Sequence, residues 1–99
     1  MKQYLLQLNS INEVQDWLIE NRQTIHLDIL EACEKEPKTD KVHIQAACIN
    51  GVSDCVMIEM GSKDEVVLSL NKCLNYYVLT EDYEMAIRTR DCLKEWNSL

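Results

Sequence analysis

Residues 62–96 carry the strongest structural signal in the chain, because their apolar side chains recur at helical spacing. Ser62 and Glu65 form a capping box, in which each side chain satisfies a free backbone N–H of the other residue. The stripe weakens around Thr80, and a connection this short makes the two helices antiparallel. The sequence therefore predicts a hairpin of two amphipathic helices with these inward-facing residues: Val66, Val67, Leu70, Cys73, Leu74, Tyr77, Val78, Tyr83, Ala86, Ile87, Leu93 and Trp96.

The first part of the chain contains one further helical signal. Ser10 and Glu13 form a second capping box, and apolar residues follow at helical spacing to about Asn21. Residues 1–9 are short and apolar, and they fit either an edge strand or a lead-in to this helix. We therefore predict a helix near the N-terminus and leave the segment before it open.

Strand-like alternation marks the middle of the chain. In residues 24–33 apolar and polar residues alternate at first, although the last four residues, LEAC, favour a helix. We predict a strand there, because β-branched residues crowd its start. Residues 41–60 alternate on both sides of Asn50-Gly51, a dipeptide typical of tight turns, and are predicted to form a β-hairpin.

Together these signals predict an α+β protein that forms a single compact domain over residues 1–99. The N-terminal helix and the sheet are expected within residues 1–60, and the helical hairpin within residues 61–99. We expect the sheet to be a three-stranded antiparallel β-meander made from residues 24–33 and 41–60. The C-terminal antiparallel helical hairpin is expected to pack on one face of that sheet.

The charge of the chain excludes some classes of partner. Its 17 acidic and 10 basic residues give a net charge of −7. Nucleic-acid binding needs clustered Lys and Arg that displace counterions, so we expect no direct nucleic-acid partner. No apolar run approaches the roughly 20 residues that span a bilayer, and the N-terminus lacks the apolar core of a signal peptide. We therefore expect a cytoplasmic protein without a membrane partner.

The five cysteines are odd in number and widely spaced, and they form no CxxC or CxH pair. This usage is typical of free thiols in a reducing compartment. The two histidines, His26 and His43, are isolated, so a metal site would need ligands from distant parts of the chain, and we predict none. The cysteines are Cys33, Cys48, Cys55, Cys73 and Cys92.

The sequence also lacks the motifs of common active sites. No GxGxxG, phosphate loop, GxSxG or HExxH pattern occurs, and two glycines cannot build a phosphate cradle. A cysteine nucleophile needs a histidine base, and only a chance approach of Cys48 to His26 or His43 across the sheet would supply one. We therefore predict no enzymatic activity, no catalytic residues and no cofactor.

One part of the predicted hairpin matches a known pattern, carried by Glu81, Asp82, Tyr83, Glu84, Ala86, Arg90, Asp91 and Leu93. This pattern resembles the UVR motif, a helical hairpin found in nucleotide-excision-repair subunits, in the linker of some Clp-type ATPases and in small regulatory proteins. The resemblance covers residues 66–96. Ile87 and Thr89 depart from it, since the family has a small residue and a Leu at these positions.

The resemblance implies a docking or dimerisation element that has no chemistry of its own. The partner-binding residues that it implies are Glu81, Asp82, Tyr83, Glu84, Arg90 and Asp91, and we add Ile87 to the predicted set although it departs from the family pattern. The same residues also fit a hairpin that is merely stable. Acidic residues suit the start of a helix, Tyr83 and Ala86 fill the seam, and Glu84 stands four residues before Arg88 in the favourable order for an ion pair. Both interpretations stay open.

Two functions are therefore weighed. The first is a small non-catalytic interaction or regulatory protein, which binds a protein partner or a second copy of itself through the C-terminal hairpin. The alternative is an acidic inhibitor of the mobile-element or phage type, which imitates nucleic acid or blocks a basic host enzyme. The alternative requires carboxylates that line one face, drawn from Glu13, Asp16, Glu20, Glu31, Glu34 and Glu36.

Overall fold

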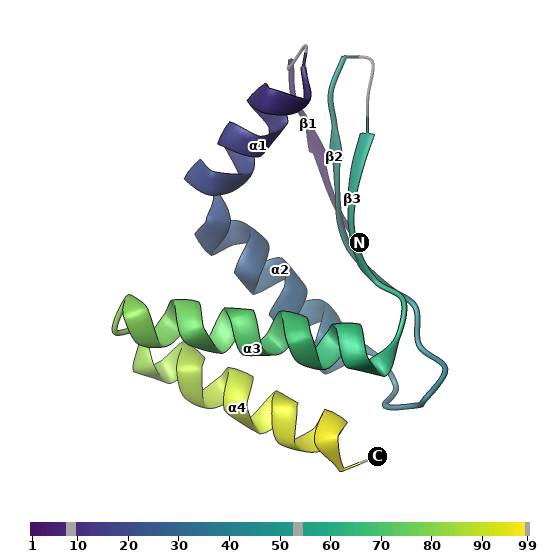
Figure 1. Ribbon diagram of the computed structural model, residues 1–99, viewed down its shortest axis with the longest axis vertical. Helices are drawn as coiled ribbons and strands as arrows, with labels where there is room; N and C mark the ends of the chain where they lie inside the picture. Colours follow the sequence, from purple (N-terminus) through teal and green to yellow (C-terminus); the bar gives the residue numbers. More distant parts are fainter. Residues whose placement is uncertain (8–9, 53–54, 99) are drawn as a thin grey trace.

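A computed structural model describes residues 1–7, 10–52 and 55–98 of the chain. The protein is α+β, and its elements are β1 (Lys2–Leu5), α1 (Ile11–Glu20), α2 (Arg22–Lys35), β2 (Ile44–Asn50), β3 (Cys55–Met60), α3 (Lys63–Leu79) and α4 (Tyr83–Asn97). Figure 1 shows the helices on one side of the sheet, with α3 and α4 lying together across the C-terminal end of α2.

The sheet is mixed rather than antiparallel, with the strand order β1-β2-β3. β2 and β3 form the antiparallel hairpin predicted over residues 41–60. β1 pairs parallel with β2, in a register that runs from Lys2 opposite Ala47 to Leu5 opposite Asn50. Parallel neighbours need a long crossover between them, and α1 and α2 provide it.

The predicted antiparallel meander with an N-terminal helix is therefore wrong. The third strand comes from residues 2–5, so a strand and not a helix is the first element of the chain. Residues 2–5 thus settle the open choice for the first segment in favour of a strand, while residues 8–9 of that segment lie outside the described residues. The helix predicted after Ser10 is present as α1, and the Ser10 hydroxyl accepts a hydrogen bond from the Glu13 N–H.

The strand predicted over residues 24–33 is also wrong, because these residues lie inside α2. Ile25, Ile29 and Cys33 recur four residues apart and pack into the core, which is the spacing of one helical face. Leu27, which alternation groups with Ile25 and Ile29, falls on another face of the helix. The alternation of apolar and polar residues in 24–33 is therefore too short to indicate a strand. These residues form a helix, which buries one face against β2.

A bulge in β2 divides the core into two parts. The register between β2 and β3 shifts between Gln45 and Ala47, so the consecutive residues Ala46 and Ala47 are both buried. Ala46 belongs to the larger cluster, which joins α2, α3 and α4 to the sheet. Ala47 belongs to the smaller cluster, where α1 and α2 meet the sheet around Val14 and Ile49.

The end of α2 is held by the last helix. An α-helix leaves its last four carbonyl groups without intrahelical partners, and Pro37 has no N–H to offer the Cys33 carbonyl. Trp96 Nε1–H of α4 donates to the Cys33 carbonyl oxygen at 3.1 Å, and Lys38 Nζ donates to the Glu34 carbonyl oxygen at 2.8 Å. The Trp96 side chain is fully buried, so this bond ties α4 to α2 inside the core.

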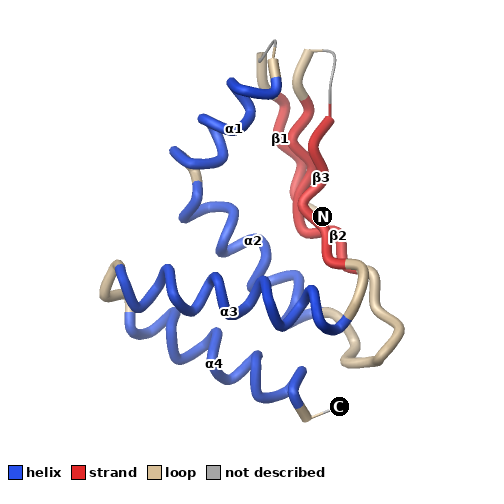
Figure 2. The backbone as a smooth tube through the Cα atoms, viewed as in Figure 1, coloured by secondary structure: helices blue, strands red, loops and turns tan. Residues whose placement is uncertain are grey.

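The helical hairpin predicted for residues 61–99 is present as α3 and α4, but its predicted position on a sheet face is wrong. α2 lies against β2, and the α3–α4 hairpin lies against α2, with a smaller contact between α3 and β3. Figure 2 shows α2 running beside the sheet and reaching the α3–α4 hairpin at its C-terminal end. The start of α3 is as predicted, because the Ser62 hydroxyl accepts a hydrogen bond from the Glu65 N–H.

We predict that Trp96→Phe lowers the free energy of unfolding by about 2 kcal/mol, because it leaves the buried Cys33 carbonyl without its donor. The measurement is urea-induced unfolding followed by circular dichroism. Trp17→Phe is the matched control, since Trp17 is only half-buried and packs its ring against Tyr4. The control change is expected to cost under about 1 kcal/mol. Equal losses in the two variants contradict the assigned role of Trp96.

Candidate functional site

The turn between α3 and α4 has a defined backbone geometry. Thr80 is the C-cap residue that follows α3, and the Asp82 N–H donates to the Tyr77 carbonyl oxygen at 2.8 Å. The Glu81 N–H donates to the Val78 carbonyl oxygen at 3.1 Å. These two bonds form a Schellman motif, in which the residue after the helix cap adopts a left-handed conformation. The Asp82 carboxylate then caps the start of α4 by accepting a hydrogen bond from the backbone N–H of residue 85 at 3.4 Å.

Glu81 occupies the left-handed position of this turn, with a φ of 58°. Among the described residues it is the only one other than glycine with a positive φ. Glycine is the usual residue here, since a side chain adds about 1 kcal/mol of strain or more in this conformation. A residue that persists in a strained conformation where glycine would serve is typical of functional positions.

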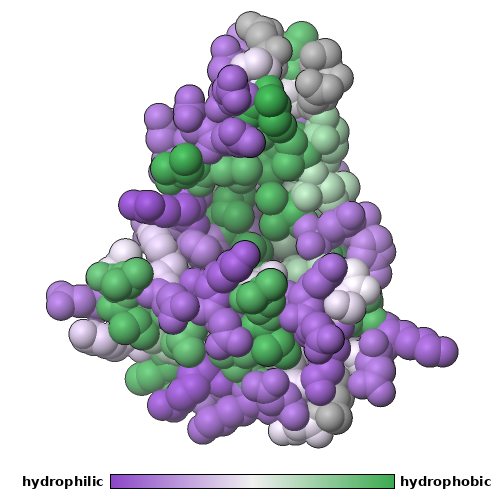
Figure 3. All heavy atoms as spheres, viewed as in Figure 1, coloured by the Kyte–Doolittle hydropathy of each residue, from purple (hydrophilic) through white to green (hydrophobic). Residues whose placement is uncertain are grey.

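Exposed apolar side chains gather on both sides of the turn. Val78 and Leu79 end α3, while Tyr83 and Ile87 lie one helical turn apart at the start of α4. Between 49% and 83% of the surface of each of these side chains is exposed. Figure 3 shows hydrophobic surface at the end of the hairpin where α3 and α4 join. We call Val78, Leu79, Glu81, Tyr83 and Ile87 the hairpin tip.

A groove of about 430 Å³ adjoins the hairpin tip, between α2 and the hairpin. Its walls combine apolar side chains with both acidic and basic groups. The lining residues are Gln23, Thr24, Leu27 and Glu31 of α2, Tyr77 of α3, the turn residue Asp82, and Met85 and Arg88 of α4. The groove can therefore take a side chain with an apolar stem and a polar end.

The Tyr77 hydroxyl is the unusual group in this groove. Its side chain is almost completely buried, and within residues 1–7, 10–52 and 55–98 its oxygen is the only buried side-chain nitrogen or oxygen without a hydrogen-bond partner. Burial raises the pKa of Tyr77 to about 12, with a smaller contribution from the neighbouring Cys73. The hydroxyl thus stays protonated at neutral pH, and an unmet donor of this kind costs about 1–3 kcal/mol.

Arg88 connects the wall of the groove to α2. Its guanidinium binds the Glu34 carboxylate through two bonds, from Nε at 2.8 Å and from Nη2 at 2.6 Å. The hydrogen bond to Glu34 raises the pKa of Arg88 above its usual value. The expectation that Glu84 and Arg88 would pair along α4 is not met by this geometry, because the guanidinium engages α2 instead. The positive charge in the groove is therefore already compensated.

The structure brings together some of the residues predicted to bind a partner and separates others. Glu81, Tyr83 and Ile87 share the hairpin tip, and Glu84 is exposed beside them. Asp82 lines the groove and caps α4. The remaining predicted residues, Arg90 and Asp91, lie further along α4 on exposed surface and pair with each other at 3.4 Å.

Sequence reasoning missed the residues that α2 contributes to the groove. Thr24 and Leu27 were assigned to a strand, so their approach to the hairpin was not foreseen. Tyr77 was predicted as a core residue, and it is buried as predicted. Nothing in the sequence indicates that its hydroxyl lacks a partner, since that depends on which groups surround it in three dimensions.

The carboxylates proposed for an acidic inhibitor do not form one uniform row. Glu13, Asp16 and Glu20 are exposed on α1. The other three, Glu31, Glu34 and Glu36, are half-buried in or just after α2. Glu34 is also engaged in the ion pair with α4. The geometry therefore favours this alternative less than it favours the hairpin tip.

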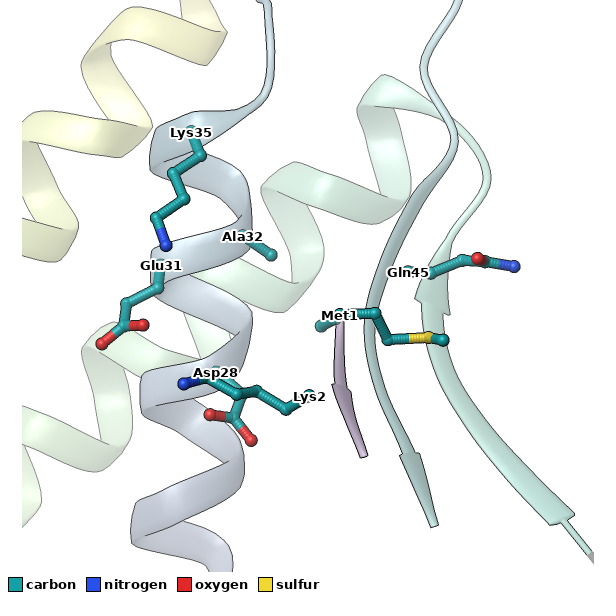
Figure 4. Close-up of a pocket in the computed structure, with 8 residues that line it drawn as sticks. Met1, Lys2, Asp28, Glu31, Ala32, Lys35 and Gln45 are labelled. Atoms are coloured by element: carbon teal, nitrogen blue, oxygen red, sulfur yellow. The ribbon is translucent and has the colours of Figure 1, made fainter. Parts of the chain in front are cut away.

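A second cavity, of about 300 Å³, lies between α2 and the strands β1 and β2. The Tyr4 hydroxyl donates to the buried carboxylate of Asp28 there, and burial together with this bond raises the pKa of Tyr4 to about 12. Figure 4 shows Lys2 extending from β1 across to α2 near Asp28, with Glu31 and Lys35 on the same helix. Because its buried carboxylate already has a donor, this cavity is explained as the joint between β1 and α2.

One cysteine and one histidine meet in the core, although not the pair considered from the sequence. Cys73 Sγ lies 3.4 Å from His26 Nδ1, and the His26 ring stacks on Tyr76. Burial raises the pKa of Cys73 to about 12 and lowers the pKa of His26. Both groups are therefore neutral at pH 7, so this pair lacks the thiolate that a cysteine nucleophile requires.

Comparison of the chain with protein-family models, with curated proteins and with solved structures found no significant match. The resemblance of residues 66–96 to the UVR motif therefore stays a prediction. Over the described ranges, no three or more His, Cys, Asp or Glu side chains are grouped so that they could hold a metal ion. In the same ranges no helix is both long enough and apolar enough to cross a membrane.

We predict that Glu81→Gly raises the free energy of unfolding by about 0.5 kcal/mol. Glycine relieves the left-handed strain, although it also gains freedom in the unfolded chain. Urea-induced unfolding measures the change. Glu84→Gly is the matched control, because the same substitution within α4 is expected to lower the free energy of unfolding by about 0.8 kcal/mol. Destabilisation by Glu81→Gly contradicts the assignment of strain.

Proposed function

We propose that this protein is a non-catalytic interaction protein, which binds a protein partner through the hairpin tip and the adjoining groove. The observation that carries the proposal is the coincidence of three features within a few residues of one turn. These are a strained Glu81, exposed apolar side chains on both helix ends, and the unpartnered Tyr77 hydroxyl. Each one costs stability or solubility in the free protein, and a bound partner covers the exposed apolar side chains.

The charges around the hairpin tip indicate the chemistry of the partner. The exposed carboxylates of Glu81 and Glu84 flank the apolar side chains of Tyr83 and Ile87. The whole chain has a net charge of −7, so two copies repel each other, whereas a basic surface is attracted. The partner is therefore a protein segment that presents apolar side chains together with Lys or Arg.

The groove refines this description. Tyr77 lines the groove, but its hydroxyl is buried, so the groups that offer contact to a partner are the other lining residues. Leu27 and Met85 offer apolar contact to the stem of a side chain, and Glu31 and Asp82 offer carboxylates to its end. A basic side chain of the partner fits this set of groups, because its stem is apolar and its end is cationic.

The UVR-like residues add support of another kind. In the families that this pattern resembles, the hairpin is a docking or dimerisation element. Glu81, Tyr83 and Ile87, which belong to the predicted set, form the hairpin tip together with Val78 and Leu79. The predicted residues Arg90 and Asp91 lie outside it, so we assign them no contact with the partner.

Photocrosslinking tests the proposal directly. Benzoylphenylalanine at position 83 is expected to capture one defined protein in the cells that produce this chain. The same group at position 59, an exposed residue of β3, is the control and is expected to capture none reproducibly. Capture of the same protein at both positions, or of a second copy of this chain at position 83, contradicts the proposed partner class.

The captured partner then allows a quantitative test. Tyr83→Ala combined with Ile87→Ser is expected to weaken its binding at least tenfold in calorimetry, because exposed apolar anchors dominate interface energies. Leu5→Ser removes an even more exposed apolar side chain on the sheet and serves as the control, with unchanged affinity expected. Raising the salt concentration is expected to weaken the wild-type complex, since opposite charges meet in it. Unchanged affinity of the folded double variant overturns the proposal.

A further inference from the structure

The face of the sheet that points away from the helices carries two cysteines close together. Ala47 and Ile49 of β2 are buried in the cluster with α1 and α2, so Cys48 between them points to the opposite face. Cys55 at the start of β3 is exposed, and Figure 2 shows the helices on the other side of these strands. The Sγ atoms of Cys48 and Cys55 lie 2.7 Å apart.

The pairing of the strands explains this approach. Asn50 of β2 lies opposite Cys55, and Cys48 lies opposite Met57. The two cysteines are therefore diagonal neighbours on one face of an antiparallel pair. Their short side chains lean toward each other there, which brings the Sγ atoms to 2.7 Å. A disulfide bond has an S–S distance of about 2.0 Å, so the two sulfurs need to move together by only about 0.7 Å.

We infer that Cys48 and Cys55 form a reversible intramolecular disulfide by exchange with a low-molecular-weight disulfide of the glutathione class. The site is independent of the hairpin tip, because it lies on the sheet and uses no residue of the tip or the groove. It also refines the expectation of five free thiols, since two of the five form a dithiol that reacts as a pair.

The exchange proceeds in two substitutions at sulfur. The exposed Cys55 thiolate attacks one sulfur of the oxidant RSSR, the S–S bond of the oxidant breaks, and RS⁻ leaves and takes up a proton. The Cys48 thiolate then attacks the Cys55 sulfur of this mixed disulfide, and a second RS⁻ leaves and takes up a proton. Two protein thiols are oxidised to one disulfide, and one RSSR is reduced to two RSH.

The remaining cysteines provide an internal comparison. Cys33, Cys73 and Cys92 are buried between α2, α3 and α4. Burial raises the pKa of Cys33 and of Cys73 to about 12, and that of Cys92 to about 11. The first step of thiol–disulfide exchange requires a thiol that the oxidant can reach, and Cys55 is the exposed one of the five, so these three thiols do not compete. Cys48 is buried as well, but it acts only in the second step and needs to reach only the adjacent Cys55 sulfur.

The bond changes one local network of hydrogen bonds. The Cys48 thiol donates to Asn50 Oδ1 at 3.4 Å, and oxidation removes this donor. The Asn50 side-chain amide donates to Gln3 Oε1 and to the Tyr4 carbonyl oxygen of β1, and these bonds need no thiol. Oxidation therefore joins β2 to β3 covalently and leaves the contacts of Asn50 with β1 in place.

The test is oxidation of the reduced, folded full chain with glutathione disulfide, followed by denaturation, alkylation of the remaining thiols and tryptic digestion. Residues 42–63 form one tryptic peptide that contains both Cys48 and Cys55. This peptide is expected without alkyl groups and lighter by two hydrogen atoms than its reduced form. Dithiothreitol is expected to restore two alkylation sites in it, while Cys33, Cys73 and Cys92 are alkylated throughout.

Two variants separate the roles of the sulfurs. Cys48→Ser is expected to stop at the mixed disulfide, with glutathione retained on Cys55, and Cys55→Ser is expected not to react. Cys92→Ala is the control and is expected to form the bond as the wild type does. Alkylation of both cysteines in the wild-type peptide after oxidation overturns the inference. A disulfide that includes a buried cysteine, or one that joins two chains, overturns it equally.

Discussion

The arrangement of the whole protein depends on how the C-terminal end of α2 is completed. Pro37 prevents the helix from satisfying the Cys33 carbonyl, and Trp96, which lies 63 residues further along the chain, supplies the missing donor. This bond, the Arg88–Glu34 ion pair and the apolar cluster around Leu30 hold the α3–α4 hairpin against α2. Because α2 also packs on β2, one helix links the sheet to the hairpin.

This arrangement secures the hairpin at one end and leaves the other end uncovered. Near the C-terminus of α4, Trp96 and Leu93 are buried, whereas Leu79, Tyr83 and Ile87 at the opposite end remain exposed. Three unfavourable features therefore lie at or beside the hairpin tip. They are exposed apolar surface, backbone strain at Glu81 and the buried Tyr77 hydroxyl without a hydrogen-bond partner. Exposed apolar surface at one end of a rigid hairpin is the observation on which we base the proposed binding surface.

Elements that begin with a capping box or show a long alternation could be predicted from the local sequence. The capping boxes at Ser10 and Ser62 and the alternation around Asn50-Gly51 correctly predicted α1, α3 and the β2–β3 hairpin. The alternation in residues 24–33 misled because three apolar residues cannot distinguish a strand from one face of a helix. The parallel pairing of β1 depends on a long-range contact, and the lack of a partner for the Tyr77 hydroxyl depends on which distant residues surround it. Glu81, Tyr83 and Ile87 were predicted to bind a partner, but Val78, Tyr83 and Ile87 were also predicted to face inward, and they are exposed. The strain and the groove were not predicted.

We propose that the Glu81 carboxylate, which is held at a strained backbone position, contacts the partner. The most direct test is the affinity of Glu81→Gly and Glu81→Asn for the protein captured at position 83, measured by calorimetry beside the free energy of unfolding. Both variants are expected to be at least as stable as the wild type and to bind several-fold more weakly. Wild-type affinity in both variants contradicts the account, because the strain then has no counterpart in binding.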